Sequence, residues 1–438
     1  MLIEFTVTNF RSFRDPATLS MLATHLASKS EEVDRRVRFA LPDGRELLRS
    51  AVVYGANASG KSNLLEALYL FRAVVLNSAR EGQRGDRVPV APFRLDVDSP
   101  TRPSSFEAVF MAAGTQYRYG FEATPERIVR EWLHHRPEKR ERELFTREDQ
   151  VVKCSGVFKE GEGLAAKTRK NALFLSVVAQ FNGSLATRIL DWFEGQLRVL
   201  TKVHEPDAGG HSMREFTAKC LQDPDLAVLG ERVLSLLKTA DLGIESFEVE
   251  ERDYIAALPR GMPEELQQVI RRYGPPKWSS VRTRHGVEDA KGARVGSIDF
   301  DLDIEESDGT RRFFALAGPV VDCLLGGRVL AIDELDARLH PLLTRALVGL
   351  FHDPEANTKN AQLVFATHDV LLLEPDTFRR DQVWFTEKGR SGATKLLGLA
   401  EFNGVRDDEA YRLAYLRGKY GAVPLLRHFG EGLRGQGE

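Results

Sequence analysis

Hydrophobic residues along the chain follow two periodicities, and the change from one to the other marks the expected elements. Residues 2–7 (LIEFTV) and 47–55 (LLRSAVVYG) are rich in β-branched, aromatic and other apolar residues, which predicts two strands. Residues 61–79 (KSNLLEALYLFRAVVLNSA) place apolar residues at helical spacing, which predicts an amphipathic helix. The sequence therefore predicts a strand, a glycine-containing loop and a helix in direct succession.

The stretch from residue 104 to residue 150 alternates apolar and polar positions around short turns. This alternation predicts an antiparallel sheet inserted after the first helix. Residues 171–182 (NALFLSVVAQFN) return to a continuous apolar run, which we interpret as a strand that ends near Gln180. Residues 184–245 carry helical spacing, most clearly in LATRILDWFEGQL and DLAVLGERVLSLLKTADLGI.

The C-terminal half alternates short apolar strands with helical segments. Residues 295–325 predict a strand, a turn and a helix. Further short strands are predicted at RVLAIDEL (328–335), AQLVFATHD (361–369) and DQVWFTE (381–387). Strands that alternate with helices are typical of the α/β class, and the chain length allows two or three domains.

Composition narrows the class of protein. The 438 residues include 61 basic and 64 acidic side chains, a net charge of −3, so no strongly basic body points to nucleic acid. The cysteines are far apart and odd in number, which fits a reducing cytoplasm; they are Cys154, Cys220 and Cys323. The N-terminus lacks an apolar signal core, and we find no stretch of about 18 uncharged apolar residues. We therefore expect a cytoplasmic protein with no membrane contact.

Residues 55–62, GANASGKS, fit the phosphate-binding pattern G-x-x-x-x-G-K-[ST]. Gly55 and Gly60 would let backbone N–H groups close around phosphate oxygens, while Lys61 reaches the β- and γ-phosphates and Ser62 holds Mg²⁺. The motif requires a strand before it and a helix after it, and both are predicted. A chance glycine turn is the alternative, which this context disfavours.

The strand RVLAIDEL ends in two carboxylates, Asp333 and Glu334. Asp333 can support Mg²⁺ through water, and Glu334 can orient or deprotonate an attacking water. Carboxylates at the end of a buried strand are costly unless a cation or a polar site compensates them. An acidic surface turn without a role is the alternative, and the phosphate-binding motif favours the catalytic interpretation.

These motifs together resemble those of ABC-type ATPases of the SMC/RecF-like branch, in which two nucleotide domains sandwich ATP. The loop GANASGKSN carries the resemblance, as does NFRSF at residues 9–13. The resemblance implies that Arg11 and Ser12 lie near the nucleotide; alternatively, Phe10 and Phe13 are core residues and Arg11 is solvated. It also implies further ATP-binding residues: Asn57, Ser59 and Asn63.

The same resemblance assigns roles to three weaker motifs. Gln180 would contact Mg²⁺ and the attacking water, or else it is merely a polar strand end. His368 would contact the γ-phosphate, although a lone histidine at a strand end is more often structural. Asp336, in LDARLHP, matches the D-loop of this family.

The turn ESDGTRRFFAL at 306–316 stands where the family has its signature motif. Ser307, Gly309 and Thr310 would contact the γ-phosphate of ATP held by another subunit. Thr310 and Asp308 depart from the family pattern, and Asp308 near a phosphate would be repulsive unless it turns away. A simple helix N-cap at Ser307 is the alternative, and the two interpretations are compatible.

The resemblance implies a P-loop ABC-type ATPase fold of the α/β class with an antiparallel β-subdomain and an inserted helical subdomain. We expect a slow ATPase that uses ATP and Mg²⁺ and forms a homodimer or higher even oligomer. The expected segments are an N-terminal ATPase lobe at 1–183, a helical insertion at 184–295, a C-terminal ATPase lobe at 296–400 and a tail at 401–438.

The motifs SDGTRRFFALAG, DELDARLHP and YLRGKYGAVP resemble those of stand-alone ATPases of bacterial phage-defence operons, such as AbiL- and RloA-type proteins. That resemblance implies an effector partner from a neighbouring gene, often a nuclease. Arg417, Lys419 and Tyr420 could contact a partner or nucleic acid, or form an exposed basic helix end. Two alternative functions stay open: a RecF-like ATPase that clamps DNA, and a nucleotide-gated scaffold with little turnover.

Overall fold

The computed structural model describes residues 1–26, 30–201, 213–240, 243–253, 263–266, 268, 277–406 and 409–424. The chain divides into two compact units. Unit 1 comprises residues 1–199, 331–335 and 362–438, and unit 2 comprises residues 200–330 and 336–361. These units divide the chain differently from the four expected segments. Parts of the expected helical insertion and of the expected tail, including residues 425–438, lie outside the described residues.

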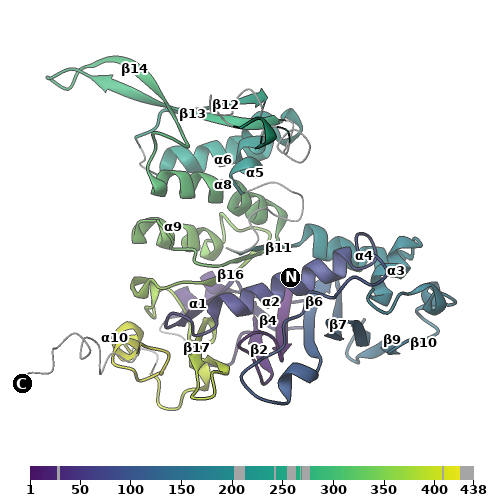
Figure 1. The fold of residues 1–438 in the computed structure, drawn as a ribbon. Helices are drawn as coiled ribbons and strands as arrows, with labels where there is room; N and C mark the ends of the chain where they lie inside the picture. Colours follow the sequence, from purple (N-terminus) through teal and green to yellow (C-terminus); the bar gives the residue numbers. More distant parts are fainter. Residues whose placement is uncertain are drawn as a thin grey trace, which may run out of the picture. The chain divides into compact units, whose positions relative to one another are not determined.

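Unit 1 contains a seven-stranded sheet with the order β10-β9-β8-β7-β6-β1-β2, whose neighbouring strands are antiparallel (Figure 1). This sheet confirms the predicted antiparallel insert, and the first strand of the chain joins it through β6. Its strands are β1 (Leu2–Thr8), β2 (Ala17–Ser20), β6 (Ser104–Ala112), β7 (Thr115–Thr124), β8 (Arg127–Arg136), β9 (Arg142–Glu148) and β10 (Val151–Cys154).

A six-stranded sheet has the order β11-β15-β16-β5-β17-β18. Strand β5 pairs in parallel with β16 on one side and with β17 on the other, and β17 pairs antiparallel with β18. The strands are β5 (Ser50–Gly55), β11 (Leu197–Leu200), β15 (Val329–Ile332), β16 (Gln362–Ala366), β17 (Val383–Lys388) and β18 (Thr394–Gly398). The single strand predicted at 47–55 is therefore divided, because β4 (Glu46–Leu48) forms a separate two-stranded sheet with β3 (Arg38–Ala40).

Helix α2 (Lys61–Asn77) follows β5 and packs against the antiparallel sheet, as the apolar spacing predicts. Its Phe71 stacks on Phe121 with ring centroids 5.6 Å apart and contacts the rings of Phe5 and Phe193 at 5.8 and 5.4 Å. Phe193 belongs to helix α4 (Ser184–Gly195), which carries most of its apolar residues on one side. This aromatic core holds α2 between the sheet and α4.

The strand predicted at 171–182 is wrong, because these residues form helix α3 (Phe174–Gln180). The buried carboxylate of Glu131 accepts hydrogen bonds from the backbone N–H groups of Phe174 and Leu175 at 2.6 and 2.9 Å, which satisfies the first turn of the helix. Arg147 lies 3.4 Å from the same carboxylate. Periodicity alone does not separate a short buried helix from a strand.

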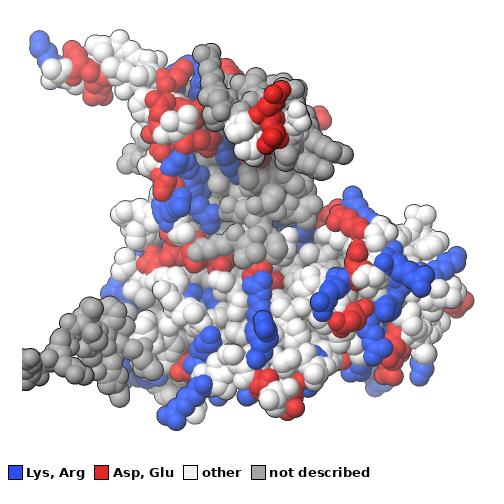
Figure 2. Space-filling model, in the orientation of Figure 1, with Lys and Arg blue, Asp and Glu red and all other residues white. Residues whose placement is uncertain are grey.

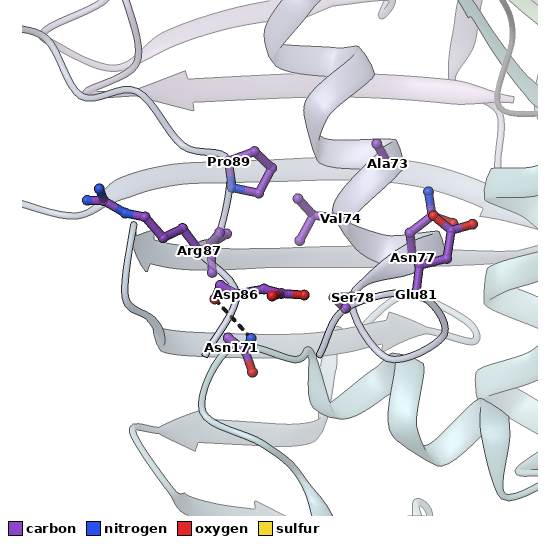
Figure 3. A pocket seen from close by; sticks show the side chains of 11 residues that line it. Ala73, Val74, Asn77, Ser78, Glu81, Asp86, Arg87, Pro89 and Asn171 are labelled. Atoms are coloured by element: carbon purple, nitrogen blue, oxygen red, sulfur yellow. Dashed lines mark hydrogen bonds between the residues drawn. The ribbon is translucent and has the colours of Figure 1, made fainter. Parts of the chain in front are cut away.

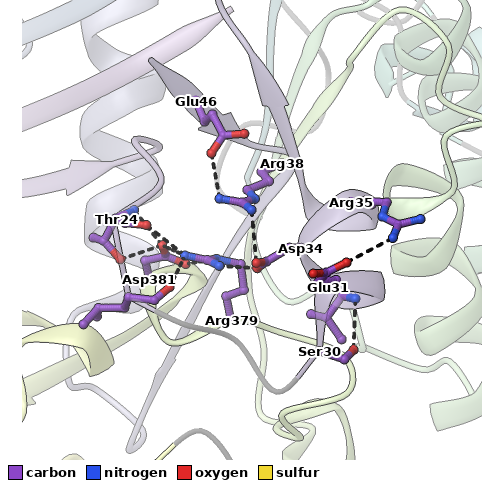
Figure 4. Close-up of polar contacts among 11 residues, drawn as sticks. Thr24, Ser30, Glu31, Asp34, Arg35, Arg38, Glu46, Arg379 and Asp381 are labelled. Carbon is purple, nitrogen blue, oxygen red and sulfur yellow. Dashed lines mark hydrogen bonds and ion pairs between the residues drawn. The ribbon is translucent and has the colours of Figure 1, made fainter. Parts of the chain in front are cut away.

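A buried ion cluster fixes the N-terminal region of unit 1 to the start of β17 (Figure 4). Arg379 is 2% exposed, pairs with Asp381 at 2.8 Å and with Asp34, and donates to the carbonyl oxygen of Thr24 at 3.0 Å. Asp34 lies on helix α1 (Glu31–Val37) and also pairs with Arg38 at 3.1 Å. Because an unpaired buried charge is strongly destabilising, these partners hold one another in place.

Unit 2 is mainly helical in its described part. Its helices are α5 (Met213–Gln222), α6 (Ala227–Thr239), α8 (Asp308–Gly326) and α9 (Pro341–His352). Helices α5 and α8 approach closely at Gly318, where an added Cβ would lie 2.6 Å from Thr217 Oγ1. A three-stranded antiparallel sheet of β12 (Ser246–Asp253), β13 (Lys277–Glu288) and β14 (Arg294–Asp301) packs through Phe247 on Phe314 of α8.

Candidate nucleotide-binding site

The loop from Gly55 to Gly60 joins β5 to α2, which is the context that the phosphate-binding motif requires. Gly60 is the N-cap of α2, with a φ of 116° that glycine adopts without strain. Lys61 begins the helix and is 5% exposed, and its Nζ donates to the carbonyl oxygens of Gly55 at 2.7 Å and Ala56 at 3.1 Å. The ammonium group therefore lies against the loop at the positive end of α2.

Glycine is required at positions 55 and 60, because neighbouring side chains approach the backbone closely there. A Cβ at Gly55 would lie 2.4 Å from Thr386 Oγ1, and a Cβ at Gly60 would lie 2.4 Å from Thr394 Oγ1. Asn57 and Ser62 are exposed on the loop and on the first turn of α2. The backbone N–H groups of this turn and the tight approach at both glycines fit a bound phosphate group.

Side chains from three other segments hold the loop in place. Thr386 Oγ1 lies 2.6 Å from Ser59 Oγ, and Thr394 Oγ1 donates to the carbonyl oxygen of Ser59 at 2.7 Å. Ser12 Oγ lies 2.8 Å from Thr394 Oγ1 and accepts a hydrogen bond from Asn63 Nδ2 at 2.7 Å. Sequence reasoning missed Thr386, inside β17, and Thr394, the first residue of β18, whose only local signal is a hydroxyl in a strand.

The NFRSF segment forms a tight turn between β1 and β2. Phe10 and Phe13 are buried and exchange two backbone hydrogen bonds of 2.8 Å. Arg11, at the tip, has a φ of 49°, and its guanidinium lies 3.8 Å from the buried Glu66 of α2. Both sequence interpretations therefore describe part of the turn: the phenylalanines are core residues, while Ser12 contacts the phosphate loop.

The carboxyl ends of β15, β16 and β5 meet at one edge of the six-stranded sheet. The backbone N–H of Leu335 donates to Ala366 at the end of β16, at 3.1 Å, and that of Thr367 donates to Val53 of β5, at 3.2 Å. Asp333 is buried, and Glu334 has a φ of 51°, a sparsely populated conformation for a non-glycine residue. In parallel sheets, ligands bind outside this edge.

His368 follows β16 at the same edge and is exposed. The next residue, Asp369, accepts a hydrogen bond from Tyr54 Oη through its carbonyl oxygen at 3.1 Å. Tyr54 directly precedes Gly55, so the chain around His368 is tied to the strand that carries the phosphate loop.

Gln180 stands apart from this edge. Helix α3 contacts α2 through Ser176, whose Oγ donates to the carbonyl oxygen of Val75 at 2.6 Å. Val75 lies about 21 Å along the helix axis from Lys61, at about 1.5 Å per residue. Within one chain, the structure therefore does not bring Gln180, an exposed helix end, to the phosphate loop.

The signature-like turn and the D-loop segment contact each other within unit 2. Ser307 is the N-cap of α8, and its Oγ accepts from the backbone N–H of Thr310 at 3.1 Å, which confirms the predicted cap. Asp308 pairs with Arg311 and lies 3.5 Å from Arg338 Nη1. The carbonyl oxygen of Arg338 would lie 3.0 Å from a Cβ at Gly309. Asp336 stands two residues before Arg338, on the same segment.

The sequence model of one protein family matches residues 50–179 and 274–374, which together make up more than half of the chain. That family is described as "AAA domain, putative AbiEii toxin, Type IV TA system". The chain belongs to this AAA-domain family. The matched segments contain the phosphate loop, Asp333, Glu334 and His368 of unit 1, together with parts of unit 2.

Two solved structures of SMC head domains are similar to this AAA-domain chain. One is the SMC head domain from Thermotoga maritima, with a TM-score of 0.38 and 13% identity, covering 91% of this chain and 98% of its own. The other is an SmcHead bound to the C-winged helix domain of ScpA, with a TM-score of 0.40 and 12% identity, covering 90% and 96%. Similarities of this size do not carry an argument about function. A comparison with curated proteins finds no match.

A cavity and the distribution of surface charge are other surface features of the AAA-domain chain. A cavity of about 330 Å³ lies at the C-terminal end of α2, away from Lys61, and is lined by residues that include Val74, Asn77 and Asn171 (Figure 3). Asn171 closes one side by donating to the carbonyl oxygen of Asp86 at 3.0 Å. On the face drawn in Figure 2, basic and acidic side chains are interspersed over the described residues.

Two further findings concern metals and membranes. The described residues contain no group of three or more His, Cys, Asp or Glu side chains that could hold a metal ion. Among the helices of the described part, none is long and apolar enough to cross a membrane.

Proposed function

We propose that this protein is an ATPase that binds ATP with Mg²⁺, dimerises around it and uses that state to control a partner effector in defence against phage. The observation that carries the proposal is the gathering of the phosphate loop, Asp333, Glu334 and the β16 end at one edge of the six-stranded sheet, where β5 and β16 run parallel. Membership of the AAA-domain family supports the nucleotide and the ATPase class.

Each residue at the edge has a distinct part in this proposal. Lys61 and the N-terminus of α2 stabilise the β- and γ-phosphates. Ser62 and Asp333 would hold Mg²⁺, which would supply charge neutralisation of the phosphate oxygens when bound. Glu334 orients and deprotonates the attacking water, and His368 contacts the γ-phosphate, since both follow strand ends at this edge.

We also propose that the ATP site is composite, which means that two subunits contribute residues to it. The resemblance to ABC-type ATPases implies that the Ser307 turn of one subunit covers ATP held by Lys61 of the other. The pairing of Asp308 with Arg311 and Arg338 removes the main objection, since the carboxylate that would repel a phosphate is neutralised by two guanidinium groups. A two-fold dimer with two such sites then forms with ATP and loosens after hydrolysis.

The control of an effector rests on the family and on sequence resemblance. The family description names a toxin of a toxin–antitoxin system, which supports a partner protein as the target. The motifs shared with stand-alone defence ATPases support a companion encoded by a neighbouring gene. We propose that the ATP-bound dimer is the state this companion recognises.

A Glu334→Gln variant tests the ATP-dependent dimer. It should bind ATP without hydrolysis and accumulate as a dimer in light scattering with ATP and Mg²⁺, while the Lys61→Ala variant should stay monomeric. A Glu334→Gln protein that remains monomeric at saturating ATP would contradict the dimer. Co-purification with the product of the neighbouring gene tests the partner, and ATP-strengthened, salt-sensitive DNA binding would favour a DNA clamp instead.

A further inference from the structure

Aromatic side chains of the C-terminal segment, defined here as residues 411–424, stack behind the phosphate loop. Tyr415 and Tyr420 flank Phe385 of β17, each with a ring centroid 5.3 Å from the Phe385 ring and interplanar angles of 17° and 23°. Tyr415 also lies 5.9 Å from the ring of Tyr54 in β5. Tyr415 is 6% exposed and Tyr420 is 1% exposed, so these rings are part of the core.

The two strand residues in this stack directly precede the residues that shape the loop. Tyr54 precedes Gly55, and Phe385 precedes Thr386, which stands opposite Gly55 in the parallel register. Successive side chains on a strand point to opposite faces, so Phe385 contacts the C-terminal segment while Thr386 contacts Ser59. One short stretch of β17 thus joins the C-terminal segment to the phosphate loop.

The C-terminal segment has its own internal order. Helix α10 (Tyr411–Leu416) is followed by Gly418 and Gly421, whose φ angles of 79° and 65° turn the chain back. Tyr415 Oη donates to the carbonyl oxygen of Ala422 at 3.1 Å, which closes this turn. A Cβ at Gly421 would lie 2.8 Å from a carboxylate oxygen of Glu387, so the turn fits closely against the end of β17.

The basic residues of this segment are used differently from the sequence expectation. Lys419 Nζ lies 2.6 and 2.8 Å from the two carboxylate oxygens of Glu409. Tyr420, which the sequence offered as a contact for a partner or nucleic acid, is buried against Phe385 and Phe402. Arg417 and Lys419 are exposed, so only Tyr420 of the three predicted contact residues is buried. The YLRGKYG motif therefore serves mainly to dock the segment.

We infer that Tyr415 and Tyr420 are positioning residues for the phosphate loop, and that docking of the C-terminal segment and binding of ATP stabilise each other. The inference rests on the proposed binding of ATP at Lys61. A rigid stack behind Tyr54 and Phe385 restricts the positions of Gly55 and Thr386, and a nucleotide that orders the loop restricts the same strands from the other side. Coupling between two sites is reciprocal, so each event strengthens the other by the same factor.

The test measures both directions of this coupling in the full chain. Tyr415→Ala should weaken ATP binding by about tenfold in calorimetry, a typical coupling factor, while Tyr415→Phe, which keeps the ring, should stay within about twofold of the parent. Phe158→Ala is the matched control: Phe158 is a buried aromatic of unit 1 whose ring centroid lies 5.2 Å from that of Phe145 in the antiparallel sheet. It should lower thermal stability and leave the affinity for ATP unchanged.

Hydrogen exchange tests the coupling in the reverse direction, from ATP binding to the docking of the C-terminal segment. ATP should slow amide exchange in residues 411–422 of the parent protein and have no such effect in the Lys61→Ala variant. If Tyr415→Ala does not fold, Gly421→Ala, which strains the turn and crowds the Glu387 side chain at the end of β17, should give a smaller loss of affinity of the same sign. Failure of the parent to bind ATP would overturn the proposed function. Normal ATP affinity in folded Tyr415→Ala or Gly421→Ala protein, with ATP binding intact in the parent, would overturn this inference alone.

Discussion

Thr386 Oγ1 lies 2.6 Å from Ser59 Oγ, so the strand beside β5 is hydrogen-bonded to the middle of the phosphate loop. Because both side chains are buried, this contact fixes the loop without water. The geometry of the loop therefore depends on a residue more than 300 positions away in the chain.

Thr386→Val should weaken ATP binding at least about fivefold, because it removes the buried hydroxyl that bonds Ser59 Oγ and the carbonyl oxygen of Tyr54, at about 1 kcal/mol for each hydrogen bond, and leaves the shape of the side chain nearly unchanged. Thr386→Ser keeps the hydroxyl and serves as the control. Calorimetric titration with ATP and Mg²⁺ measures both. Equal affinities in the two variants would show that the hydroxyl does not hold the loop.

Gly60→Ala should abolish ATP binding and destabilise the fold by more than 2 kcal/mol, since it adds a contact of 2.4 Å to the ordinary strain of a positive φ. Gly85→Ala is a matched control, because Gly85 has a φ of 97° with open space around its Cβ. Urea unfolding should place Gly85→Ala within about 2 kcal/mol of the parent. If both variants lose the same stability, the contact with Thr394 is unimportant.

Arg338→Ala should weaken the ATP-dependent dimer by about fivefold, because Asp308 would then face the γ-phosphate with one guanidinium fewer. The effect is modest because Arg338 is 67% exposed and such pairs contribute at most about 1 kcal/mol. The double variant Asp308→Asn, Arg338→Ala should recover the affinity of the parent. Concentration-dependent light scattering in the Glu334→Gln background measures the dimer affinity of these variants. An unchanged dimer affinity in Arg338→Ala would contradict this prediction.

Acidification should destabilise the antiparallel sheet through two histidines of β8. Burial lowers the pKa of His134 and of His135 below the ordinary 6.5, with nearby Arg118 and Arg142 acting in the same direction. The unfolded chain therefore binds protons at a higher pH than the folded chain, and stability that is present above about pH 6.5 is lost as the pH falls.

The double variant His134→Gln, His135→Gln should lose less stability than the parent between pH 7.5 and pH 5.5. Urea midpoints at the two pH values measure this difference. Identical losses in both proteins would show that other groups cause the acid sensitivity.

The sequence pattern predicted those parts of the fold whose signals lie close together in the chain. The strand, loop and helix around Lys61 and the cap at Ser307 were correct because their signals lie within a few residues. Helix α3 was mistaken for a strand because its first turn is completed by Glu131, 43 residues before Phe174. Thr386, Thr394 and the burial of Tyr420 depend on tertiary packing, which no local period encodes.

The most direct test of the composite ATP site mixes two inactive proteins. Lys61→Ala lacks a working phosphate loop, and Ser307→Arg lacks a working signature turn, so each should have negligible ATPase activity alone. In a mixed dimer, Lys61 of one subunit meets Ser307 of the other, and one complete site is restored. An equimolar mixture should then recover about a quarter of the parent activity if pairing is random, and up to about half if only mixed dimers form. No recovery in mixtures whose heterodimers are demonstrated would contradict a site shared between subunits.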